Sequence, residues 1–139
     1  MRLIPIMNRL KVEVDLLHGN VEAAKSLVAL PDNEVDNDLP ICFVYTKEET
    51  SEANEQVNGV LQQAGKTFAV MYACQAASDD SEPLEDLRDA VKAVLMGWSP
   101  DPDNISPISY EKGNILDTSK RVVWWVDYFS LWQLDEYNG

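Results

Sequence analysis

The chain has 139 residues, and its 24 acidic and 11 basic side chains give it a net charge of −13 at pH 7. This length predicts one domain covering residues 1–139, and 45% hydrophobic with 25% charged residues is typical of a folded globular protein. The negative charge repels phosphates, so it argues against a DNA-binding domain or a membrane-surface helix. The sequence shows neither a signal peptide nor an apolar run long enough to cross a bilayer, which predicts a soluble protein of the reducing cytoplasm.

The first part of the chain is predicted to be helical. Apolar residues recur at steps of three and four between residues 3 and 17, the spacing of one helix face. Gly19 suits the left-handed residue that follows a helix end. A second, short helix is expected over residues 21–29, and residues 31–40 are too polar to be anything but a loop.

The middle of the chain is predicted to be extended. Residues 41–45 are apolar and aromatic, which is typical of a buried strand. Residues 46–55 are polar and are expected to form a solvated, mobile segment, followed by a long extended stretch over residues 56–75. Gly59 and Gly65 predict a bend or bulge in that stretch.

The clearest helix follows a polar turn. Ser81 is expected to cap its start, Pro83 is tolerated in its first turn, and Gly97 ends it. Trp98 is then placed to fold back onto the helix, and residues 99–107 are a proline-rich loop.

Two strands are predicted to close the chain, over residues 108–116 and 121–132, with a turn at residues 117–120. The last strand is apolar on both faces, which predicts that it is central in its sheet or is covered by another subunit. The order of elements predicts an α+β fold, in which a mostly antiparallel sheet is flanked by helices.

Side chains suited to catalysis or metal binding are few. Cys42 and Cys74 lie in apolar runs, so they are expected to be small buried residues rather than a disulfide or a metal pair. His18, the one histidine, lies in a helix-ending turn, and residues 32–38 lack the glycine and glutamate that a calcium loop requires. We therefore predict no cofactor, no metal site and no enzymatic activity.

Asp127 is unusual because it interrupts an aromatic strand, where an unpaired charge is costly. Two interpretations are open from the sequence. The carboxylate could form an ion pair across a subunit interface, with Arg88 or Arg121 of a neighbouring copy. Alternatively, Asp127 could occupy an outward-facing position at a sheet edge.

Two segments resemble the tail terminator proteins of long-tailed bacteriophages. Residues 84–100 are similar to a helix of that family that ends in a Gly-Trp-x-Pro sequence. Residues 114–129, with their paired tryptophans, look like the family's closing hairpin, although a valine stands at position 126 where a polar residue is common. The N-terminal helix and the strand entry at residues 39–44 also fit.

The resemblance implies a structural virion protein that is assembled in the host cytoplasm. Such proteins form a ring, usually of six copies, on the head-proximal end of the tail tube. The ring stops tube polymerisation and docks the head connector, and DNA passes through its pore without specific binding. The implied partners are further copies of the chain, the tail tube protein and the connector. The subunit or tube interface is expected at the tryptophan-rich strand and its companion helix, with the residues Trp98, Trp124, Trp125, Asp127, Phe129, Arg88 and Arg121.

Two other functions are compatible with the acidity. The chain could be a DNA mimic that inhibits a DNA-binding enzyme, or a small enzyme or ligand-binding domain with carboxylates in a cleft. Because the acidic residues gather in predicted loops rather than along helices or strands, the terminator interpretation is favoured.

Overall fold

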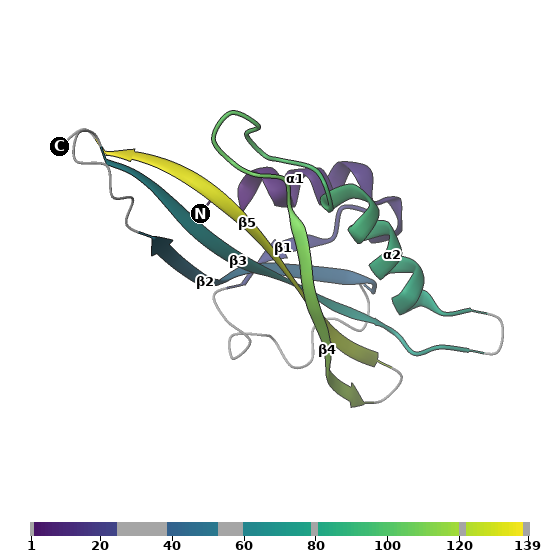
Figure 1. Ribbon diagram of the computed structural model, residues 1–139. Helices are drawn as coiled ribbons and strands as arrows, with labels where there is room; N and C mark the ends of the chain where they lie inside the picture. The colour runs from purple at the N-terminus through teal and green to yellow at the C-terminus, as the bar shows by residue number, and fades with distance from the viewer. Residues whose placement is uncertain (1, 25–38, 53–59, 79–80, 120–121, 138–139) are drawn as a thin grey trace.

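The computed structural model describes residues 2–24, 39–52, 60–78, 81–119 and 122–137 (Figure 1). Its elements in chain order are α1 (Ile4–Glu13), the short 3-10 helix η1 (Asp15–Leu17), β1 (Val21–Ala23), β2 (Ile41–Glu52), β3 (Val60–Gln75), α2 (Pro83–Leu95), β4 (Ser109–Ser119) and β5 (Val122–Tyr137).

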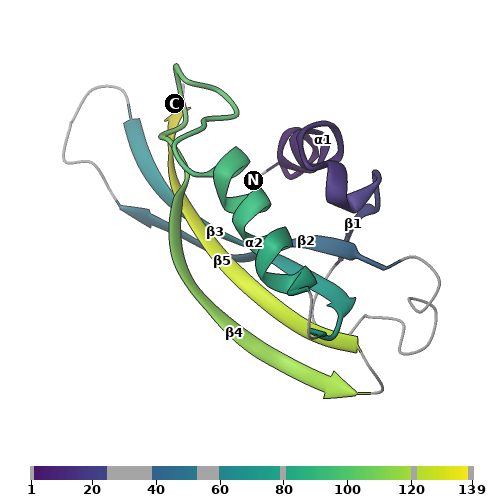
Figure 2. The ribbon, with the colours of Figure 1, turned by 90° about the vertical axis from the view of Figure 1, so that its right-hand side faces the viewer.

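The strands form one five-stranded sheet in the order β1-β2-β3-β5-β4. Among the strands that the structure describes, only β1 and β2 pair in parallel, and the other neighbours are antiparallel. Both helices lie on the same face of the sheet (Figure 2). The α+β class is therefore confirmed, as is the central position of the last strand, since β5 lies between β3 and β4.

The helix expected over residues 21–29 is wrong where the structure describes it. Residues 21–23 form β1, and the backbone N–H of Ala24 donates to the carbonyl of Val44 at 3.0 Å. Local preference for a helix is overridden here by hydrogen bonds to β2. Residues 25–38, which include most of the predicted loop, lie outside the described residues.

The solvated, mobile segment expected over residues 46–55 is a strand in its described part, although Lys47, Glu48 and Glu49 are exposed as expected. Residues 46–52 continue β2 and stay paired with β3 as far as Glu52 opposite Gln63. A register shift between Thr46 and Glu48 marks a bulge in this polar strand, whereas Gly65 pairs regularly with both of its neighbouring strands. Gly59 lies outside the described residues.

The helix expected over residues 3–17 is divided in the structure, because α1 ends at Glu13 and η1 follows over Asp15–Leu17. His18 and Gly19 adopt left-handed φ angles of 50° and 79° after η1, and Gly97 has φ 79° after α2, as expected. The Gly97 N–H donates to the carbonyl of Ile108 at 2.9 Å, so this turn also ties the helix end to the start of β4. Ser81 is not the helix cap; Glu82 occupies that position without a side-chain cap bond.

Alternation along the strands builds two apolar layers. On one face, side chains of β3 and β5 such as Phe68 and Phe129 pack beneath α1 and α2. On the other face, Phe43, Met71 and Val126 form a second buried layer. Cys42 and Cys74 are buried and free, as expected from their apolar surroundings. Burial raises the pKa of both thiols.

Candidate assembly surfaces

The carboxylate of Asp127 lies at the centre of a polar cluster beneath α2, and its residue is 0% exposed. The Arg88 guanidinium donates two hydrogen bonds to it, from Nε to Oδ2 and from Nη2 to Oδ1, each 3.1 Å long. The Tyr110 hydroxyl and the Trp125 Nε1 also donate to Oδ1, at 3.1 and 2.9 Å. We call these four residues the Asp127 cluster. Since a buried charge is costly unless it is paired and hydrogen-bonded, the cluster supplies what the carboxylate needs.

The cluster holds Arg88 in its charged form. Burial acts to lower the pKa of Arg88, but the hydrogen bonds and charges of Asp127 and Glu85 together outweigh burial and raise it. The guanidinium also lies 4.4 Å from the centre of the Trp125 ring and forms an ion pair with the exposed Glu85 at 3.1 Å. Burial and then the charge of Asp127 raise the pKa of the Tyr110 phenol. The cluster therefore fastens α2 to β4 and β5.

Gly113 makes room for this cluster from the neighbouring strand. It pairs with Asp127 in the register of β4 and β5. A Cβ atom at this position would lie 2.7 Å from the Tyr110 hydroxyl and 2.8 Å from the Trp125 Nε1, closer than real Cβ contacts. A side chain of any size at position 113 must displace the cluster.

The structure corrects both interpretations of Asp127. Its ion pair with Arg88 forms within one chain, and the residue lies on a central strand rather than at an edge. Phe129 is fully buried as well and stacks on Phe68 with 5.5 Å between ring centres. Both side chains are thus part of the interior of one subunit. Arg121 lies outside the described residues.

Two of the predicted interface tryptophans are half-buried on opposite faces of the sheet. Trp98 packs at the end of α2, with the Arg9 guanidinium 4.6 Å from the centre of its ring. Trp124 lies on the other face and stacks on Phe43 with 6.2 Å between ring centres. A role of these tryptophans in contacting the tube or a neighbouring copy stays a prediction.

The outer face of α1 is a surface that the sequence analysis did not identify. Ile4 and Val12 are 68% and 73% exposed there, although they are large and apolar. Lys11 and Asn8 are exposed as well. We define the outer face of α1 as these four residues. The signal was present in the sequence, because the segment holds more apolar residues than its single buried stripe needs.

A small groove opens beside the start of α2. It has a volume of about 190 Å³ and is lined by Gln75, Ala77, Glu82, Leu84, Glu85 and Val123. Its apolar lining and its two carboxylates make it suited to an aliphatic side chain with a basic neighbour. We call it the α2 groove.

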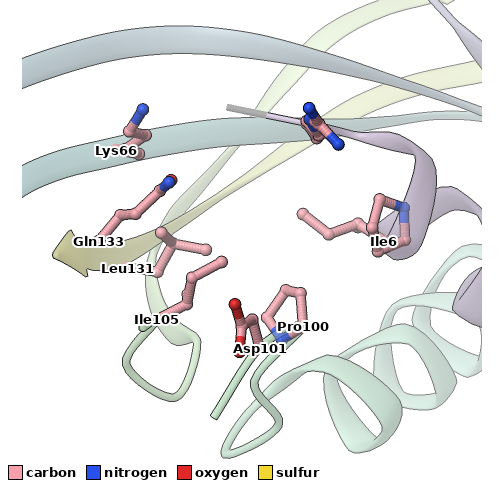
Figure 3. A pocket seen from close by; sticks show the side chains of 9 residues that line it. Ile6, Lys66, Pro100, Asp101, Ile105, Leu131 and Gln133 are labelled. Carbon is pink, nitrogen blue, oxygen red and sulfur yellow. The ribbon is translucent and has the colours of Figure 1, made fainter. Parts of the chain in front are cut away.

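A larger groove of about 530 Å³ lies where the start of α1 and the loop after α2 approach β3 and β5 (Figure 3). Lys66 enters it from β3, Leu131 and Gln133 from β5, and Asp101 and Ile105 from the loop. The Lys66 ammonium also lies 3.5 Å from a Glu49 carboxylate oxygen, an ion pair on the same strand pair. The mixture of charged and apolar groups suits a chain segment better than a reaction centre.

Neither metal ligation nor membrane insertion is indicated among the described residues. Within those ranges, no three His, Cys, Asp or Glu side chains lie close enough to hold a metal ion. Within the same part of the chain, no helix is long and apolar enough to span a membrane.

The structure is that of a small α+β protein whose polar cluster is satisfied within its own fold and whose surface carries exposed apolar side chains. The family model of the phage tail terminator protein matches residues 2–134, and the chain belongs to this family. It is a structural protein of the bacteriophage virion, in the tail.

A solved structure agrees with this assignment at the level of the fold. A chain of a structure described as "Virion of native gene transfer agent (GTA) particle" is similar over 95% of this chain and 92% of that chain. Its TM-score is 0.57 and its sequence identity 16%, so the two share their fold. No curated protein sequence matches this chain significantly.

Proposed function

We propose that the chain closes into a ring of six copies on the head-proximal end of the tail tube. The ring stops tube polymerisation and presents the docking surface for the head connector. The observation that carries this proposal is the family match, which spans residues 2–134. The family assignment also favours this function over a DNA mimic or an enzyme.

The surface of the subunit supports the ring. A closed ring of identical copies needs two different patches that fit each other. The outer face of α1 is apolar and basic, and the α2 groove is apolar and acidic, so one chain carries two unlike surfaces of this kind. Such exposed apolar side chains are typical of protein interfaces.

The charge of the chain supports the passage of DNA. A net charge of −13 per copy, repeated around a ring, repels phosphates over most of the surface. DNA therefore moves through the pore without being held by the protein. We expect no specific contact between the ring and the bases.

The direct test is the length of tails made without the protein. In cells in which the gene is deleted from the phage, we expect overlong tails that carry no heads, because nothing stops the tube. Electron microscopy measures both properties in the same images. Complementation with the intact gene should restore one tail length and head attachment. Tails of normal length joined to heads in the deletion would contradict the proposed function.

A further inference from the structure

We propose that the outer face of α1 of one copy docks into the α2 groove of the next copy. This proposal rests on the proposed ring and names the two surfaces that close it. The occupant of the groove is thus a second copy of this chain rather than the tube or the connector.

The apolar parts of the two surfaces match. Val12 and Ile4 project from α1 with most of their surface exposed. The α2 groove offers Ala77, Leu84 and Val123 around a volume of about 190 Å³, which is enough for an aliphatic side chain. Docking would remove both apolar surfaces from water, which is favourable in proportion to the area buried.

The charges of the two surfaces favour a second copy of the same chain as the partner of the groove. The outer face of α1 carries one basic residue, Lys11, and no acidic residue, although the whole chain has a net charge of −13. Residues 82–89 contain four acidic residues and one basic residue, Arg88, which is already paired with Asp127 and Glu85. An acidic chain therefore carries its own basic partner surface. Opposite charges at the edge of a contact steer the partners and fix their register.

The two surfaces cannot meet within one subunit. α1 packs beside the last turn of α2, where the Arg9 Nε donates to the carbonyl of Val94 at 2.6 Å. The α2 groove lies at the first turn of the same helix, and a helix of 13 residues is roughly 20 Å long. Figure 1 accordingly shows the start of α1 and the start of α2 on opposite sides of the helix layer. A contact between unlike surfaces of successive copies repeats until the ring closes.

Cysteine cross-linking tests this contact even if it is weak in solution. The double variant Val12→Cys, Ala77→Cys places one thiol on each surface, and both positions are exposed. The native Cys42 and Cys74 are buried and do not compete. Under mild oxidation we expect a ladder of covalent multimers that ends at the number of copies in the ring. Each single variant should give at most a dimer background. A double variant that gives no more than this background would overturn the proposal.

Charge reversal in the cross-linking background gives a second, independent readout. Lys11→Glu and Glu82→Lys should each reduce the initial rate of ladder formation about tenfold, and the two together should restore it. Added salt should slow ladder formation by the cross-linking variant that keeps the native charges, because these charged groups are exposed and salt screens them. Lys112→Glu and Glu22→Lys are the matched controls, since they make the same charge changes at exposed positions away from both surfaces. Equal effects of test and control variants, or no restoration in the double reversal, would contradict the proposed pairing.

Electron microscopy separates the failure of this contact from the failure of the ring. Annular particles or capped tails without a ladder would mean that the ring closes through other surfaces, so that the contact fails and the proposed function stands. A ladder of open chains that never close, with tails that stay overlong, would mean that the contact forms but the proposed function fails.

Discussion

The Asp127 cluster and the outer face of α1 each hold a side chain in an unfavourable environment, and only the first environment is compensated within the chain. Asp127 is a charge in an apolar interior, and four hydrogen bonds from three side chains of its own chain satisfy it. Val12 is an apolar side chain in water, and 73% of it is exposed in the single chain. The polar groups of the first site are satisfied within one subunit. At the second site, burial of the exposed apolar surface against a partner would be favourable.

The two sites also differ in what the sequence indicates about them. A charge in an apolar strand suggests a missing partner when it is seen in sequence, yet the partner is Arg88 of the same chain. Ile4 and Val12 of α1 are less conspicuous in sequence, yet they are the two most exposed large apolar side chains among the described residues. Substitutions at the two sites therefore separate side chains that hold the fold from side chains that we propose to serve assembly.

The largest effect on stability is expected at the centre of the cluster. Asp127→Ala leaves the Arg88 guanidinium buried without its main partner, which should lower the free energy of unfolding by about 3–5 kcal/mol. Urea denaturation measures the loss. Asp103→Ala, at an exposed loop position, should change stability by less than about 0.5 kcal/mol. A loss below about 1 kcal/mol at Asp127 would show that the buried pair contributes little.

Phe129 and Trp132 offer a similar contrast along one strand. Phe129 is fully buried against Phe68, so Phe129→Ala should cost about 3–5 kcal/mol. Trp132 is 44% exposed, so Trp132→Ala should cost less than about 1 kcal/mol. Thermal unfolding of the two variants checks the order. The reverse order would mean that the aromatic residue on the surface, and not the buried one, holds the sheet together.

A smaller loss is expected from crowding the cluster. Gly113→Ala forces its new Cβ against Tyr110 and Trp125, and such overpacking costs about 1–3 kcal/mol. Gly97→Ala is the matched control, because it meets no atom within 4 Å and strains only a left-handed backbone, at a cost of about 1 kcal/mol. Urea denaturation of both variants should place Gly113→Ala below Gly97→Ala in stability; the opposite ranking counts against the close approach.

The elements that the sequence predicted correctly are those determined by residues close together in the chain. The periodic apolar stripes gave α1 and α2, and Gly97 marked the end of α2 because left-handed backbone favours glycine. Gly19 follows η1, whereas α1 already ends at Glu13. The two-faced apolar pattern of residues 122–132 correctly placed β5 inside the sheet. These features depend on neighbours in the chain, so the sequence alone contains them.

The errors share a non-local cause. The strand at residues 21–23 exists because its backbone pairs with β2, and the polar residues 46–52 are extended because β3 lies beside them. The pairing of Arg88 with Asp127 was expected between neighbouring copies, whereas the structure forms it within one chain, between residues 39 positions apart. For the surfaces, the composition of α1 indicated surplus apolar residues, but only the packing of the helix shows which of them face water.

A pH effect at Tyr72, a buried residue that pairs with Trp125 in the sheet, is expected to be smaller still. Burial and then the charge of Asp127 raise the pKa of the Tyr72 phenol well above its ordinary value. The folded state therefore keeps this proton above about pH 10, where an unfolded chain loses it. The stabilising contribution is fully present below pH 10 and declines as the pH rises further. Tyr72→Phe should flatten the alkaline loss of stability between about pH 9 and about pH 11; an unchanged slope would assign that loss to other groups.

The smallest effect on stability should accompany the largest effect on assembly. Val12→Asp changes an exposed side chain, so its free energy of unfolding should stay within about 0.5 kcal/mol of the wild type. Urea denaturation checks that the variant folds. A larger loss would mean that the outer face of α1 contributes to the subunit's own fold.

The most direct measurement is the length of tails assembled with the folded Val12→Asp protein in place of the wild type. We predict overlong tails without heads for this variant, and tails of one normal length, joined to heads, for the wild type and for the surface control Glu22→Lys. Normal, head-bearing tails made with a folded Val12→Asp protein would contradict the assignment of the outer face of α1 to ring closure.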